Sequence, residues 1–219
     1  MRTINIALLA FIAVFVASGS AFAIVDDSDI HYLDFTGWDD ALISGTGQTF
    51  ANLYAGSVVG LVDVTVQQVG GSPSFAGGGK VHIERGEPGS QDFLFSFSKP
   101  LRFIVHHRTT DLNEDVSLAT TSAVGYTQID GSSIVQTSIP DGLRVDGQAY
   151  GIPPTGGAAE GQFRVLGGAS GATYTYGSVV GFPKYDTFRV GVLVPEPNTS
   201  ALIGIGLLGM AMSFRRRNK

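Results

Sequence analysis

Residues 93–105 read Phe-Leu-Phe-Ser-Phe-Ser-Lys-Pro-Leu-Arg-Phe-Ile-Val, and this stretch decides the class of fold. The three phenylalanines of 93–97 recur at every second position, which places their rings on one face of an extended strand. The apolar residues of 101–105 alternate in the same way. Because Lys99-Pro100 between the two runs is typical of a turn, we expect a hairpin at the centre of one sheet, with both apolar faces inward.

The same period of two recurs through the middle of the chain. The valines of 62–66 alternate with polar residues, and clusters of glycine, serine, aspartate and proline bound each run. Asp130-Gly131 and Asp141-Gly142 are typical of hairpin turns. Residues 46–54 are the one stretch in which we allow a short helix. Further strands are predicted at 81–83, 123–129, 134–139, 162–166, 172–176 and 188–194.

About ten short strands predict an all-β fold for residues 24–194, namely an antiparallel β-sandwich of the jelly-roll-like kind, with an Ig-like sandwich as the alternative. The composition agrees, because 30 glycines among 219 residues and a charged fraction of 15% exclude a coiled coil and a charge-rich disordered chain. The chain has no cysteine, which excludes a disulfide framework, a thiolate zinc site and a cysteine nucleophile.

The first 23 residues have the features of a secretory signal peptide. Arg2 supplies the positive start, 4–16 is an apolar run broken only by Asn5, and Ala21-Phe22-Ala23 is a small-x-small cleavage site. We therefore expect export and a mature chain that begins at Ile24. An uncleaved anchor helix is the alternative.

The C-terminus combines three elements in order. Val194, Pro195, Glu196 and Pro197 come first, an apolar run follows from Ala201 to Phe214, and Arg215, Arg216 and Arg217 close it. Fourteen residues make a helix of about 21 Å, so we expect a short membrane helix over about 199–214 with a basic tail at 215–219 on the cytoplasmic side. A buried apolar C-terminal element is the alternative.

This arrangement resembles the PEP-CTERM sorting signal of Gram-negative bacteria, which has a Val-Pro-Glu-Pro motif, a short membrane helix and a basic cluster. The resemblance covers residues 194–219 and implies recognition by an exosortase, a membrane protease. It implies export across the inner membrane, transient anchoring there, and release to the cell envelope or an extracellular polysaccharide (biofilm) matrix. Asn198 departs from the serine or threonine common in the family. The sequence thus divides into a signal peptide (1–23), an exported domain (24–194) and a sorting segment (195–219).

The exported domain is acidic, with nine basic and eighteen acidic residues and a net charge of −9. We therefore expect it to bind neither nucleic acid nor anionic lipid by charge, and to favour cations. Asp111, Asn113 and Asp115 place oxygen ligands at alternate positions, as at the start of a calcium loop. Val116 and Ser122 stand where an EF-hand needs Gly and Glu, which excludes that motif. A solvated acidic loop is the expectation, a structural calcium in a sandwich loop is the alternative, and no other cofactor is expected.

Two further groups of residues have the chemistry of a metal site. His82, Glu84 and one of His106 and His107 have the chemistry of a zinc site, although adjacent histidines point to opposite faces of a strand. The acidic stretch 26–29 has the chemistry to complete a cation site, with a hydrated, solubilising start of the mature chain as the alternative.

Trp38, Tyr174 and Tyr176 have the chemistry to stack on sugar rings, and the two tyrosines share a strand face. Core packing is the expected role of Trp38. No catalytic motif is evident. We therefore expect a non-enzymatic structural or adhesive protein associated with extracellular polysaccharide. A secreted glycan-active hydrolase with the same sorting tag is the alternative.

Overall fold

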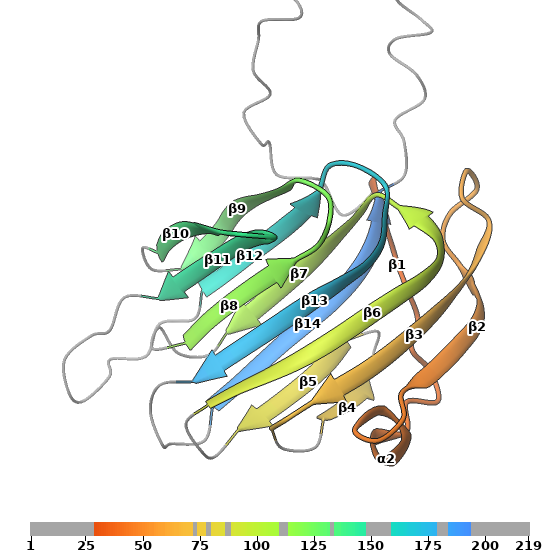
Figure 1. The fold of residues 1–219 in the computed structure, drawn as a ribbon, viewed down its shortest axis with the longest axis horizontal. Coiled ribbons are helices and arrows are strands. Elements are labelled where there is room, and N and C mark those ends of the chain that lie inside the picture. Colours follow the sequence, from red (N-terminus) through yellow and green to blue (C-terminus); the bar gives the residue numbers. More distant parts are fainter. Residues whose placement is uncertain are drawn as a thin grey trace, which may run out of the picture.

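Two antiparallel sheets of seven strands each pack face to face in a computed structural model (Figure 1). The structure describes residues 29–71, 74–77, 80–85, 89–109, 114–131, 134–147, 159–178 and 184–193. The first sheet has the order β4 (Ser74–Gly77), β5 (Lys80–Arg85), β14 (Lys184–Leu193), β7 (Phe103–Thr109), β12 (Ala159–Val165) and β9 (Val124–Gly131), with β1 (Ile30–Tyr32) paired to β14. The second has the order β10 (Ile134–Ile139), β11 (Gly142–Gly147), β8 (Glu114–Ala119), β13 (Ala169–Ser178), β6 (Gly89–Leu101), β3 (Leu61–Val69) and β2 (Gln48–Tyr54).

The all-β class and the antiparallel sandwich are confirmed, and the predicted strands all lie within observed ones or overlap them. The prediction of a helix in 46–54 is wrong, because that stretch is β2. The described helix, α2 (Asp40–Ile43), comes earlier, where the side chain of Asp39 accepts hydrogen bonds from the amides of Ala41 and Leu42. An N-cap of this kind satisfies donors that would otherwise lack partners at a helix start.

The predicted hairpin across Lys99-Pro100 is also wrong. β6 continues through these residues to Leu101, and the chain then crosses to the other sheet, where β7 begins at Phe103. The alternation agrees with the crossing. Every odd-numbered residue from 93 to 105 except Lys99 is apolar and buried. A two-residue turn at 99–100 would instead have moved the inward positions of the second strand to even numbers. Both apolar faces do point inward, as expected, but from opposite sheets.

Of the two hairpins predicted at Asp-Gly pairs, one is confirmed and the other is wrong. Pro140-Asp141 closes the β10–β11 hairpin, in which Ile139 pairs with Gly142. Asp130-Gly131 instead ends β9, and the next strand, β10, lies in the other sheet. The local turn signal is the same at both places, so it does not by itself decide whether the chain reverses within a sheet or crosses to the other one.

The core lies between the inner faces of the two sheets. The rings of Phe93 and Phe95 on β6 contact Phe188 on β14, with centroids 5.0 and 5.9 Å apart. Phe97 contacts Phe103 at 5.0 Å, which joins the two sides of the β6–β7 crossing. Packing of this kind holds a cysteine-free domain together.

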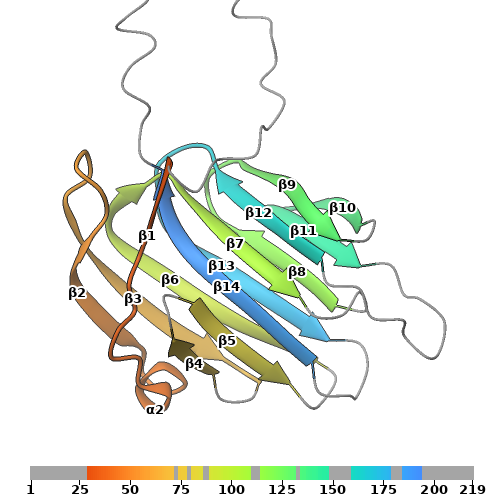
Figure 2. The ribbon, with the colours of Figure 1, turned by 180° about the vertical axis from the view of Figure 1, so that it is seen from behind.

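Both ends of the described chain lie at one end of the sandwich. Ile30 on β1 pairs with Leu193, the last residue of β14, and Figure 2 shows the two strands side by side. The predicted signal peptide and membrane helix fall outside the described residues. In the portion that is described, no helix is long and apolar enough to cross a membrane.

We predict that Phe95→Ala strongly destabilises the exported segment 24–194, which contains every described strand. Phe95 is 2% exposed, and truncating a buried Phe costs about 3–5 kcal/mol, out of a total near 5–15 kcal/mol. Thermal unfolding followed by circular dichroism measures the loss. Ser96→Ala is the matched control, because Ser96 is exposed on the other face of β6. A mild Phe95→Ala beside a damaging Ser96→Ala would contradict the register.

Candidate functional site: the outer face of the first sheet

The outer face of the first sheet collects arginines from three segments of the chain. On β7 the odd-numbered side chains point into the core, so Arg108 and, just before the strand, Arg102 point outward and are exposed. Arg164 on β12 lies opposite Ile104, and Arg189 on β14 lies opposite His106. We call these four arginines the cationic face.

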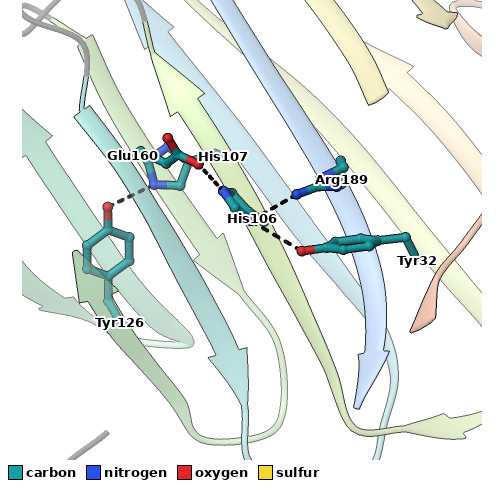
Figure 3. Close-up of polar contacts among 6 residues, drawn as sticks. All are labelled: Tyr32, His106, His107, Tyr126, Glu160 and Arg189. Carbon is teal, nitrogen blue, oxygen red and sulfur yellow. Dashed lines mark hydrogen bonds and ion pairs between the residues drawn. The ribbon is translucent and has the colours of Figure 1, made fainter. Parts of the chain in front are cut away.

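A polar network lies at the middle of this face (Figure 3). The Nε2 atom of His106 is 2.6 Å from Oε1 of Glu160, and its Nδ1 atom is 3.3 Å from the Tyr32 hydroxyl and 3.4 Å from an Arg189 nitrogen. The Arg189 guanidinium stacks over the Tyr32 ring at 3.8 Å from its centroid. Four segments distant in the sequence therefore converge on one imidazole.

These contacts fix the hydrogen-bonding role of each ring nitrogen of His106. The Arg189 guanidinium can only donate, so Nδ1 accepts from it and from the Tyr32 hydroxyl. Nε2 then carries the proton and donates it to the Glu160 carboxylate. The network therefore holds the imidazole as an Nε2–H tautomer and engages the carboxylate that faces the arginines.

Arg102 and Arg164 lie close enough to interact. The pKa of Arg164 is lowered, first by burial and then by the positive charge of Arg102. Within the described part of the chain, no ion pair joins Arg102, Arg108 or Arg164 to a carboxylate. Repulsion of this kind is relieved when an anion binds between the guanidinium groups.

The cationic face revises what the net charge of −9 suggested. Net charge predicted that anionic partners would be disfavoured, but four of the nine basic residues of 24–194 lie on one face, where Glu160 lies opposite Arg108. At a Debye length of about 8 Å in physiological salt, a partner on this face meets the local arginines more than the distant carboxylates. The local charge, and not the sum, decides what can bind there.

The opposite side of β7 is buried. His107 is 1% exposed, its Nε2 atom is 3.0 Å from the Tyr126 hydroxyl, and burial, with a smaller effect of His106, lowers its pKa to about 3. The imidazole is therefore neutral at physiological pH. Gly161 makes room for this pair, because a Cβ there would lie 1.9 Å from the Tyr126 hydroxyl oxygen.

The residues considered for zinc are not brought together. His106 and His107 point to opposite faces, as expected, and β14 separates His82 from His106. Two strand spacings and a two-residue offset put the Cα atoms of His82 and His106 roughly 12 Å apart. Among the described residues, no three histidine, aspartate or glutamate side chains are grouped as metal ligands. The Glu84 side chain lies outside the described part of the chain, as do residues 26–28.

The calcium hypothesis stays a prediction. Asp111 and Asn113 fall outside the described residues. Asp115 is the second residue of β8, and its Oδ2 atom is 2.6 Å from the Arg144 guanidinium on β11. Burial raises the Asp115 pKa, with the Arg144 charge acting in the opposite direction. One of the three predicted ligands is thus already engaged by a cation.

The tyrosines weighed for sugar stacking are not available for it. Tyr174 and Tyr176 do share a face, but it is the inner face of β13, and both are fully buried. Trp38 packs on Phe35 and Phe50, so the core role expected for it is confirmed. The aromatic side chain of the cationic face is Tyr32, which sequence reasoning missed because a three-residue strand shows no periodicity.

Comparison with known proteins identifies the C-terminus. The family model described as the PEP-CTERM protein-sorting motif matches residues 193–217. The chain carries a PEP-CTERM sorting motif. No curated protein and no solved structure matches the chain.

The PEP-CTERM motif marks an exported protein with a membrane-anchored C-terminal sorting signal that an exosortase processes. The match contains the predicted motif residues 194–197 and the arginines 215–217. It begins at Leu193, the last residue of β14. The sorting signal therefore follows the sandwich directly.

We predict that the native host removes the residues after the PEP-CTERM motif. Proline disfavours a helix interior or a central strand, and the motif has proline at 195 and 197, which suits recognition by a protease. Intact-mass spectrometry of protein purified from that host should show a chain that has lost Lys219. Retention of Lys219 on most of the protein would contradict the processing.

We predict that Asp186→Asn stabilises the 24–194 segment above neutral pH. Asp186 is buried and accepts a hydrogen bond from Tyr174, and burial raises its pKa to about 7. Between pH 4 and 7 the folded carboxyl holds a proton that the unfolded chain releases, so stability falls as pH rises through this window. Asparagine lacks this titration.

The melting temperature of Asp186→Asn minus that of the unmodified segment should therefore increase between pH 4 and pH 8. A few kcal/mol are involved, or several degrees at roughly 2–4 °C per kcal/mol. The opposite titration of His107 is common to both proteins and cancels. A difference independent of pH would contradict the assignment.

Proposed function

We propose that residues 29–193 form a non-catalytic adhesive module of the cell envelope that binds an acidic extracellular polysaccharide through the cationic face. The observation that carries the proposal is the convergence of four arginines on one sheet face of a net-acidic domain. The PEP-CTERM motif supports the proposal, because an exported chain would meet polymers outside the inner membrane.

The size of the cationic face suits a polymer better than a small anion. Arg102 and Arg108 are six residues apart along β7, which is about 20 Å at 3.3 Å per residue. Arg164 and Arg189 lie on the strands on either side of β7. A chain of sugars carrying carboxylate or sulfate groups would meet several guanidinium groups at once, and each pair gains a charge-assisted hydrogen bond.

Tyr32 adds an aromatic ring, a second kind of group that sugar-binding sites use. Its ring lies on the outer face beneath Arg189, and its hydroxyl is held by His106. An oriented aromatic ring beside hydrogen-bonding groups suits the apolar faces and hydroxyl edges of a sugar. The rigid network means that little side-chain order would have to be gained on binding.

The proposed architecture for this role is the jelly-roll-like sandwich expected from the sequence. From β5 to β14 the chain changes sheets at every connection except the β10–β11 hairpin. Such alternation between two sheets supports a double-sheet jelly roll over an up-and-down arrangement. It also explains how three separate segments deliver arginines to one face.

A glycan-active enzyme is the second candidate. The observation in its favour is the His106–Glu160 pair at 2.6 Å beside the Tyr32 hydroxyl, because groups of this kind can exchange protons. Among the described residues, Glu160 is the carboxylate that contacts His106. The retaining and inverting glycosidase mechanisms use a pair of carboxyl groups, an arrangement different from this imidazole–carboxylate pair, so binding without turnover is the first candidate.

We predict that the double variant Arg102→Ala/Arg164→Ala weakens binding to acidic polysaccharide about tenfold. Each exposed charge pair contributes up to about 1 kcal/mol, and about 1.4 kcal/mol corresponds to a factor of ten. Affinity electrophoresis of the purified protein through gels containing acidic or neutral polysaccharides measures retention. Arg144→Ala is the control for loss of a positive charge elsewhere on the domain, since Arg144 lies on the second sheet and pairs with Asp115.

Retention should fall with added salt and be absent for neutral polymers. Equal retention of both arginine variants, or equal retention on neutral gels, would contradict the cationic face as the binding surface. Incubation with the same polymers, followed by analysis of chain length, separates the two functions. Turnover that is lost in His106→Ala would replace the adhesive role by the enzymatic one.

A further inference from the structure

The tip of the β2–β3 hairpin exposes apolar side chains. Tyr54 is 51%, Val58 66% and Leu61 57% exposed. Tyr54 and Leu61 are cross-strand partners at the end of the hairpin, and Val58 lies in the turn between them. Exposed apolar groups that gather in this way mark a surface that contacts something other than water.

The tip lies at the end of the sandwich where the described chain begins and ends. The Tyr54 ring meets that of His31 on β1, with centroids 4.8 Å apart. β1 pairs with Leu193, whose amide donates to the carbonyl of Arg102. Figures 1 and 2 show the hairpin tip projecting at the same end of the sandwich as the start of β1 and the end of β14.

The tip is held in one shape by its own hydrogen bonds. The amide of Ala55 donates to the carbonyl of Gly60 at 2.8 Å, and the amide of Gly60 donates to Gly56 at 2.8 Å. Gly60 has φ of +72°, which a side chain would disfavour. The Lys99 ammonium donates to the carbonyl of Val59 and ties the tip to the end of β6. The apolar side chains are thus presented on a fixed loop.

The sorting signal brings this end of the domain close to a membrane. Seven residues, 194–200, separate Leu193 from the apolar run that begins at Ala201. Fully extended, they span at most about 28 Å, which is shorter than the 13-residue strand β6, about 43 Å long at 3.3 Å per residue. While the PEP-CTERM signal is anchored, the hairpin tip therefore lies on the side of the domain nearest the lipid.

We propose that the tip formed by Tyr54, Val58 and Leu61 docks on the phospholipid surface of the membrane while the chain is anchored. Val58 and Leu61 would enter the boundary between headgroups and acyl chains, and Tyr54 would take the interfacial position that its ring and hydroxyl favour. Docking fixes the orientation of the sandwich, so that the motif at 194–197 is presented at the membrane surface. The proposal rests on the anchoring that the sorting motif marks and not on polysaccharide binding.

Site-specific labelling of the full chain tests the proposal, because the protein has no cysteine. Val58→Cys carries an environment-sensitive nitrobenzoxadiazole dye, and the chain is reconstituted in vesicles of phosphatidylethanolamine and phosphatidylglycerol. Ser90→Cys is the matched control, since Ser90 is exposed near the start of β6, about 36 Å along the strand from Leu101. Flotation of the vesicles first establishes that both labelled chains are anchored.

Emission from the dye at position 58 should shift to the blue, and spin-labelled lipids should quench it, whereas the dye at position 90 should show neither effect. Equal emission and quenching at the two positions in floated vesicles would overturn the docking while leaving anchoring intact. Chains that do not float would overturn the anchoring and the docking with it. Neither outcome bears on retention by polysaccharide, which is measured separately.

Discussion

Successive side chains of a β-strand point to opposite faces, and in β7 this constraint separates core from surface. Phe103, Val105 and His107 point into the sandwich, and His106 points out of it. The two adjacent histidines therefore have unrelated surroundings. His107 is neutral and bonded to Tyr126, whereas His106 lies in the network with Tyr32, Arg189 and Glu160. A shift of register by one residue would exchange them and place an arginine in the core.

The same alternation gathers the arginines. In each of the strands β7, β12 and β14, every second side chain is buried in the core between the sheets. The alternate side chains point to the outer face, where polar groups can remain in water. Since the three strands are neighbours, their outward residues form one continuous surface. An acidic domain acquires a cationic face in this way without any basic run in its sequence.

The position of the chain ends determines which end of the sandwich is attached to the sorting signal. The sandwich ends at Leu193, where the sorting motif begins, and the β2–β3 tip lies beside that point. Arg102 of the cationic face lies at this same end, since the Leu193 amide donates to its carbonyl, and Arg108 lies about 20 Å further along β7. The proposed lipid contact and the proposed polymer contact would therefore use different surfaces, the hairpin tip and the outer face of the first sheet.

The sequence by itself determined the features that depend on neighbouring residues. The alternation of 93–97 identified buried strands, the absence of a 3.6-residue period identified an all-β fold, and the linear order of 194–217 identified the sorting motif. Only the tertiary structure decided the pairing of strands, because partners such as Arg164 and Ile104 are far apart in the chain. The crossing at Arg102 shows the limit, since a hairpin and a change of sheet fit the same local pattern and differ only in which distant strands cover the apolar face. The network around His106 and the cationic face follow from that pairing, and for this reason no local pattern could have revealed them.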